Sequence, residues 1–269
     1  MFPLGGKSFP TTSEQLAAAV SAGLSTVLTF PAGAAPVSLQ GKYPAMNAVK
    51  IDLSGARFDQ DQLPPEPRGT GQAQTGPSAA ALLVVAHPIL IRSAPAHLDL
   101  TAADAKFNYD RDAAGKPVLV LAGARAGQLS LQIQQADLRA LILSGARDAA
   151  AKQGVQIQDV NLALTQIDSR SIAAEVRVKA KKLFLNATVA IRGTLRIDDE
   201  MNANVSGLSC TGEGMLGDMA SAIIRPKLDA INGKTFPLSA ISLGSVKLHD
   251  LQLEIREAVK VSAKFGSEG

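Results

Sequence analysis

Hydrophobic positions follow a helical period in three stretches of the chain and alternate with polar positions through most of the rest. The helical stretches run from Thr11 to Leu28, from Asp137 to Gln153 and from Met215 to Ile231. The alternating runs between and after them predict half-buried β-strands. We therefore expect an α+β fold in which a long, strongly curved antiparallel sheet wraps around the long apolar third helix.

The ends of these elements carry the usual signals. Thr12 and Gln15 have the spacing of a capping box, so they predict the start of the first helix. Gly154 predicts the end of the second helix, and Asn232-Gly233 the end of the third. Pro88 lies inside the apolar run from Leu82 to Ile91, which favours an edge position or a bulge there. The other expected strands include Val49 to Leu53, Leu129 to Ile133, Val160 to Leu164, Ala174 to Val178, Leu183 to Ile191 and Leu251 to Ile255.

One segment interrupts this pattern. Gln, Pro, Gly and Thr dominate from Asp59 to Ser78, which predicts a flexible insert. Strands are expected on both sides of it, so it does not mark a domain boundary. We expect residues 1–269 to form a single domain with this insert at about 59–78.

Composition narrows the range of functions. Hydrophobic residues make up 46% of the 269 residues and charged residues 19%, which is typical of a globular chain. Aromatic residues make up only 4% and there is no Trp, which argues against a sugar-stacking or nucleic-acid-stacking surface. A net charge of +3 is too weak to predict nucleic-acid binding but is compatible with an anionic membrane surface. The single cysteine, Cys210, is expected to be a small buried residue.

The chain shows no secretory signal and no membrane-spanning run. The first residues lack the basic and apolar regions of a signal peptide. No window contains the roughly 18 apolar residues of a membrane span. We expect a cytoplasmic or peripheral membrane protein; a chain trimmed of a leader would look the same.

A search for catalytic motifs finds none. Gly233-Lys234-Thr235 resembles the end of a P-loop, but Leu228 occupies the position of the required glycine. The stretch from Gly207 to Thr211 resembles a nucleophile elbow without its closing glycine. The acidic cluster from Asp198 to Glu200 is better explained by a solvated hairpin turn than by a cation site. His87, His97 and His249 are scattered among the strands. We expect no catalytic residues, no metal and no cofactor.

A basic strand offers one candidate binding surface. The basic residues here are Arg177, Lys179, Lys181, Lys182, Arg192 and Arg196. On the strand they alternate with apolar residues, so they are expected to point outward while the apolar set points inward. The simpler interpretation is a solvated face or an edge strand protected by lysine. The functional interpretation is a surface that contacts anionic lipid headgroups.

The remaining feature is apolar volume. The third helix and the strands that follow the second helix have more hydrophobic positions than a short core needs, which indicates either an acyl-chain cleft or a core packed with its own side chains. The residues expected to contact lipid are Met215, Leu216, Met219, Ile223, Leu228, Leu183, Leu185, Val189, Phe236 and Leu238.

The order of elements also resembles a known family. The features that match are the N-terminal helix, the strand Val49 to Leu53, the segment Leu131 to Leu138 leading into a helix, the strand Val155 to Ile167, and the ending from Leu228 to Leu238 with its later strand positions Leu243, Val246, Leu248 and Leu251. In these the chain is similar to the LmeA-like phospholipid-binding proteins of the tubular lipid-binding superfamily. The resemblance implies a sheet rolled around a long helix, with an apolar groove for acyl chains and no catalytic residues. The insert at 59–78 and the scarcity of aromatic residues depart from that pattern.

We therefore expect a protein that binds phospholipid or another acyl-chain lipid, for lipid transfer or membrane maintenance, with peripheral membrane contact and no nucleic-acid partner. The alternative is a structural or protein-interaction module whose apolar faces fill each other. An enzyme that acts on lipid is the least favoured hypothesis.

Overall fold

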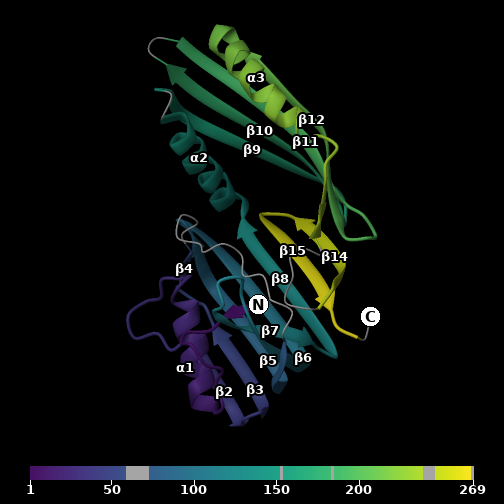
Figure 1. Ribbon diagram of the computed structural model, residues 1–269. Helices are drawn as coiled ribbons and strands as arrows, with labels where there is room; N and C mark the ends of the chain where they lie inside the picture. The colour runs from purple at the N-terminus through teal and green to yellow at the C-terminus, as the bar shows by residue number, and fades with distance from the viewer. Residues whose placement is uncertain (59–72, 152–153, 183–184, 239–245, 268–269) are drawn as a thin grey trace. The chain divides into compact units, whose positions relative to one another are not determined.

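The computed structural model describes residues 1–58, 73–151, 154–182, 185–238 and 246–267, with only the backbone described at Lys182, Leu185, Met215, Leu216 and Pro237. It has an α+β fold with three helices and open, curved sheets (Figure 1). The chain was expected to be one domain over 1–269. It divides into two compact units.

Unit 1 comprises Met1–Gln132, Ser239–Asp250 and Ser262–Gly269, and unit 2 comprises Ile133–Leu238 and Leu251–Val261. Three strands contribute residues to both units: β8 (Ala126–Gln134), β14 (Leu248–Ile255) and β15 (Ala258–Phe265).

The larger sheet has the order β14-β15-β8-β6-β5-β3-β2, with β4 pairing with β5, and β7 pairing with β1 and β6. Its other strands are β1 (Phe2–Pro3), β2 (Val37–Lys42), β3 (Ala45–Asp52), β4 (Arg57–Phe58), β5 (Gln74–Ile91), β6 (Ala94–Arg111) and β7 (Pro117–Gly123). Most neighbouring strands are antiparallel, but β5 runs parallel to both β3 and β4. The expectation of an antiparallel sheet was therefore wrong at these pairs.

Helix α1 (Ser13–Leu24) covers one face of this sheet in unit 1. Its side chains Leu16 and Val20 are 2% and 3% exposed, and they pack in the same core as Leu82 and Val84 of β5. The cavity left in this core is about 10 Å³, too small to hold a ligand. Among the described residues, the side chains around this cavity therefore fill this part of the unit 1 core.

The start of α1 confirms the predicted cap with one change. The backbone N–H of Gln15 donates to Thr12 Oγ1 at 3.2 Å, as in a capping box. In a capping box the Gln15 side chain would accept from the backbone N–H of Thr12. Here Gln15 Oε1 accepts instead from the backbone N–H of Thr11, at 2.9 Å.

Unit 2 contains a second sheet with the strand order β13-β12-β11-β10-β9. Its strands are antiparallel: β9 (Gln156–Asp168), β10 (Ser171–Lys182), β11 (Leu185–Ile197), β12 (Asn202–Glu213) and β13 (Thr235–Pro237). Helix α2 (Gln135–Ala151) lies against β9, and helix α3 (Gly214–Asp229) lies against β12 and β11 (Figure 1). No described helix in either unit is long and apolar enough to cross a membrane.

The sequence signals for a strand irregularity, a helix end and an insert lie close to the corresponding features of the structure. Pro88 follows a cis peptide bond, and the register between β5 and β6 shifts between Ala86 and Ile89, which confirms a bulge. Gly154 adopts φ +65° just after α2. Most of the expected insert, 59–72, lies outside the described residues. Strand β5 begins at Gln74, so the predicted C-terminal limit of the insert, Ser78, was too late and lies inside this strand.

Candidate functional site

The two faces of the unit 2 sheet have opposite character. Val176 of β10 is directly opposite Leu162 of β9 and Ile191 of β11, and Val178 is opposite Val160. Residues directly opposite each other in an antiparallel pair share a face of the sheet. One face is therefore apolar across its central strands; we call this face the trough. Its members are Val160, Leu162, Leu164, Ala174, Val176, Val178, Val189, Ile191 and Leu195.

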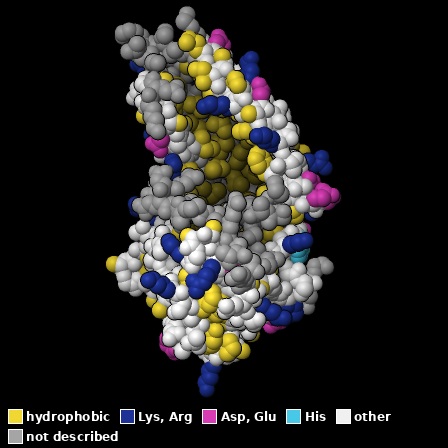
Figure 2. Space-filling view, viewed as in Figure 1, with side chains coloured by type: hydrophobic (Ala, Val, Ile, Leu, Met, Phe, Trp, Pro, Cys, Tyr) yellow, Lys and Arg dark blue, Asp and Glu magenta, His cyan; other side chains and the backbone are white. Residues whose placement is uncertain are grey.

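The trough is open along its middle. Strand β10 has a partner on each side, yet all of its described apolar side chains are only partly buried. Apolar side chains on central strands of the unit 1 sheet, such as Leu82 at 2% and Leu100 at 5%, are buried in the core of that unit. Figure 2 shows the hollow on this face, with hydrophobic side chains over its floor, between the positions of α2 and α3 in Figure 1.

Helix α3 approaches the trough face through its small residues. A Cβ at Gly212 of β12 would lie 2.0 Å from the Gly217 carbonyl oxygen, and Gly212 shares the trough face with Val189, its partner on β11. Gly217 and Ser221 are buried, one turn apart on the side of α3 that faces the sheet. The helix therefore rests on glycine and serine rather than on its apolar stripe.

Two large apolar residues of α3 are left exposed, while Ile224 and Leu228 are half-buried. Met219 is 59% exposed and Ile223 is 61% exposed. The Arg225 guanidinium reaches toward the Cys210 carbonyl oxygen of β12, at 3.5 Å. Ile223 and Lys227 are exposed and Ala220 is half-buried, so this side of α3 is distinct from the side that carries the buried Gly217 and Ser221. The expected wrapping of a sheet around this helix is not seen among the described residues.

This close contact gives a prediction about α3. Replacing Gly212 with alanine is expected to lower the free energy of unfolding of unit 2 by about 1–3 kcal/mol, because the new Cβ must push the helix off the sheet. Denaturant unfolding measured by circular dichroism would test this. A Gly145→Ala variant in α2 is the control: no atom lies within 4 Å of its new Cβ, so stability should be unchanged or rise by up to about 1 kcal/mol. Equal destabilisation of the two variants would contradict the contact.

The structure places the predicted lipid-contacting residues unevenly. Val189 lies on the trough face and is 5% exposed, and Leu228 and Leu238 are half-buried. Phe236 of β13 is opposite Ala203 of β12 and is 44% exposed. Leu183 lies outside the described residues, and the side chains of Leu185, Met215 and Leu216 are not described. The prediction omitted the central floor, Leu162, Val176 and Val178, although the alternation of these strands marks it.

The predicted headgroup residues lie on the other face. Arg177 is opposite Asn161 and Ala190, and Lys179 is opposite Asp159 and Thr188. Arg177, Lys179 and Lys181 are exposed, as alternation predicted, and the side chain of Lys182 is not described. These cations and the trough residues are thus separated by the thickness of the sheet.

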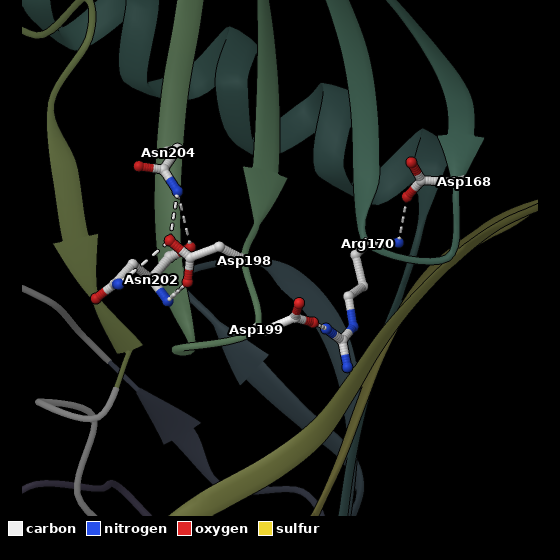
Figure 3. A network of polar contacts seen from close by, with 6 residues as sticks. All are labelled: Asp168, Arg170, Asp198, Asp199, Asn202 and Asn204. Carbon is white, nitrogen blue, oxygen red and sulfur yellow. Dashed lines mark hydrogen bonds and ion pairs between the residues drawn. The ribbon is translucent and has the colours of Figure 1, made fainter.

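Carboxylates of unit 2 have structural partners. Asp198 accepts bonds from the backbone N–H of Asn202 at 2.8 Å and from the Asn204 side chain at 3.0 Å, while Asp199 is paired with Arg170 at 2.5 Å (Figure 3). The bond from the Asn202 backbone is the main cause that lowers the pKa of Asp198. These acidic residues therefore order the turn between β11 and β12, as expected from the sequence, and no group of three or more His, Cys, Asp or Glu among the described residues could hold a metal ion.

Acid is expected to destabilise unit 2 for this reason. The pKa values of Asp159, Asp168, Glu175 and Asp198 are all lowered by hydrogen bonds in the folded chain. A carboxyl whose folded pKa is lowered adds stability above its unfolded pKa, and that stability is lost as the pH falls through the folded pKa. The melting temperature of unit 2 should fall as the pH is lowered from about 6 to about 3. Asp198→Asn should melt lower at pH 6 and show a shallower pH dependence; an unchanged slope would contradict this account.

The histidines form no catalytic arrangement among the described residues. His87 Nε2 is 2.8 Å from Asp99 Oδ1, and the His87 and His97 rings are 5.7 Å apart on an exposed surface of unit 1. Ser54 Oγ accepts from the backbone N–H of His87 at 2.9 Å, not from its ring. Cys210 is buried, as predicted, and burial raises the pKa of its thiol.

Comparison with known proteins adds no relative to this picture: no family model, no curated protein and no solved structure matches the chain.

Proposed function

We propose that unit 2 binds the acyl part of a lipid in its trough. One observation carries the proposal: a central strand with partners on both sides, β10, leaves Val176 and Val178 only half-buried. Partly exposed apolar side chains on a central strand are unusual for a chain that fills its own core, and the described cavity in the unit 1 core is only about 10 Å³. A guest molecule that covers the trough would remove this surface from water.

The energetics favour an alkyl chain as the guest. Each buried methylene contributes about 0.8 kcal/mol, so about ten methylenes contribute roughly 8 kcal/mol before the cost of immobilising the ligand. The trough floor consists of aliphatic side chains without aromatic rings, which suits a flexible chain better than a flat ring system. The LmeA-like phospholipid-binding family and its tubular lipid-binding fold remain part of this proposal, as do a role in lipid transfer or membrane maintenance and the absence of a catalysed reaction.

Native mass spectrometry of the gently purified chain tests the proposal directly. We expect a mass increase that matches an alkyl lipid, and displacement of that lipid by the fluorescent fatty acid cis-parinaric acid. Parinaric acid should gain fluorescence with a dissociation constant in the micromolar range or below. A chain that carries no lipid and gives no fluorescence gain would contradict the proposal.

The alternative is an interaction module whose trough is covered by protein. The filled core of unit 1 favours it, because part of this chain already behaves as a closed structural unit. A chain that is free of lipid and stays so after incubation with phospholipid, but self-associates, would support this alternative.

A further inference from the structure

A polar pocket of about 370 Å³ lies on the face of the unit 2 sheet opposite the trough. Three of its lining residues are cations, Arg177 and Lys179 of β10 and Arg192 of β11. Arg177 and Lys179 are two positions apart on one strand, so both side chains point to the same face. Arg192 shares that face, because it is opposite Glu175, which precedes Arg177 by two positions. The sheet therefore brings three positive groups to one concave spot.

Glu175 holds the two arginines in place without using all of their donors. Arg192 Nε donates to Glu175 Oε2 at 2.6 Å, and Arg177 Nε donates to Glu175 Oε1. One carboxylate thus bridges two guanidiniums, which leaves a surplus of positive charge. Each guanidinium has five N–H donors, so its terminal Nη groups can serve a further acceptor. Two guanidiniums and an ammonium around one position are typical of phosphate binding.

The rest of the lining is compatible with an anion. Thr188 and Thr211 supply hydroxyl donors and Asn161 supplies an amide. Two carboxylates also line the pocket, Asp159 and Glu213, but Asp159 already accepts from Arg139 Nη2 of α2 at 2.7 Å. The charged lining residues are three cations and two anions, and one of these anions is compensated by Arg139 from outside the lining.

We infer that this pocket binds a phosphate group, with Arg177, Arg192 and Lys179 as its charged donors. The inference goes beyond the trough, because the pocket lies on the other face of the sheet and needs no acyl chain. A phosphate of this kind can belong to a soluble phosphate ester or to a lipid headgroup, since both present the same oxygens to the guanidiniums.

Titration with inorganic phosphate, followed by phosphorus NMR at low salt, tests the site. The double variant Arg177→Gln/Arg192→Gln should weaken binding at least about tenfold, because two charge-assisted donor groups are lost. Arg196→Gln is the control for the Arg192→Gln half of the double variant: it removes one positive charge from the same face of β11 but at a position outside the pocket lining. It should change the affinity less than about twofold. No phosphate binding by the unmodified chain, or equal affinity in the double and control variants, would overturn the inference.

Two further variants keep the test decisive if the double variant misfolds. Glu175→Gln should raise the affinity severalfold, because it removes the anion that competes for the guanidiniums, whereas general damage can only lower it. Lys179→Gln should lower the affinity severalfold without disturbing the bridged arginines. An affinity that stays unchanged in both would overturn the inference.

Vesicles separate the two sources of phosphate. Sedimentation is compared for phosphatidylcholine vesicles with and without phosphatidic acid. If the chain binds vesicles only when they contain phosphatidic acid, and the double variant does not, the phosphate belongs to a lipid headgroup. If the chain binds inorganic phosphate but not these vesicles, the phosphate belongs to a soluble ester. Val176→Asp should leave phosphate binding intact, so failure of the trough proposal and failure of this one can be told apart.

Discussion

Val176→Asp is expected to weaken acyl-chain binding by at least about thirtyfold while the chain stays folded. The new carboxylate would lie on the trough floor between Leu162 and Ile191. An alkyl chain that covers it would have to remove its water, at a cost of roughly 2 kcal/mol or more. In the empty trough the same carboxylate remains hydrated, because this position is only half-buried. Parinaric acid titration gives the affinity, and thermal unfolding gives the stability.

Ala173→Asp is the control for this prediction. Ala173 is on the same strand but on the opposite face, where it lies across from Thr165 and Thr194. It should leave the affinity for parinaric acid within about twofold. If Val176→Asp instead unfolded unit 2 and Ala173→Asp did not, the trough would be a closed core. That result would contradict the proposed function.

Phe265→Ala is expected to cost about 3–5 kcal/mol of stability, the largest loss predicted for a single side chain here. Phe265 is 1% exposed and belongs to the packed core of unit 1. A Cβ added at Gly127 would lie 2.2 Å from its ring, so no space remains between β8 and this side chain. Truncation would leave a cavity that the surrounding strands cannot close. Urea unfolding of the full chain measures the loss in the unit 1 transition.

Phe236→Ala is the matched control, since it removes the same ring from a position that is 44% exposed. It should cost less than about 1.5 kcal/mol, because most of the transfer free energy of an exposed ring is never gained on folding. Equal losses for the two phenylalanines would mean that the unit 1 core is looser than its burial indicates.

The sequence predicted the elements of this fold better than their packing. All three helices begin and end within a few residues of their expected limits, because caps and glycines act locally. The assignment of charged and apolar residues to opposite faces of β10 is confirmed, because it follows from the two-residue period alone. The parallel pairing of β3 with β5 was missed, since alternation carries no information about strand direction.

Helix α3 shows why the candidate site was only partly predicted. The sheet was expected to wrap around its apolar positions, but the described residues of α3 that are fully buried are Gly217 and Ser221. Close approach of a helix to a sheet selects small residues, which a search for large apolar side chains passes over. Gly212, Gly214 and Gly217, spaced closely at the end of a strand, were the available signal. The openness of the trough was not predictable, because it depends on which elements fail to cover β10.

Helix α2 protects an edge of the unit 2 sheet through hydrogen bonds. Strand β9 is at the end of the strand order, and two arginines of α2 serve its outer carbonyls: Arg139 Nε donates to Val160 and Arg147 Nε to Ile157, at 2.5 Å and 3.3 Å. No residue of α2 is buried, so this helix has little apolar packing to hold it there. An uncovered strand edge recruits strands from other molecules. Loss of these two guanidiniums should therefore appear first as concentration-dependent aggregation, before any measurable loss of ligand affinity.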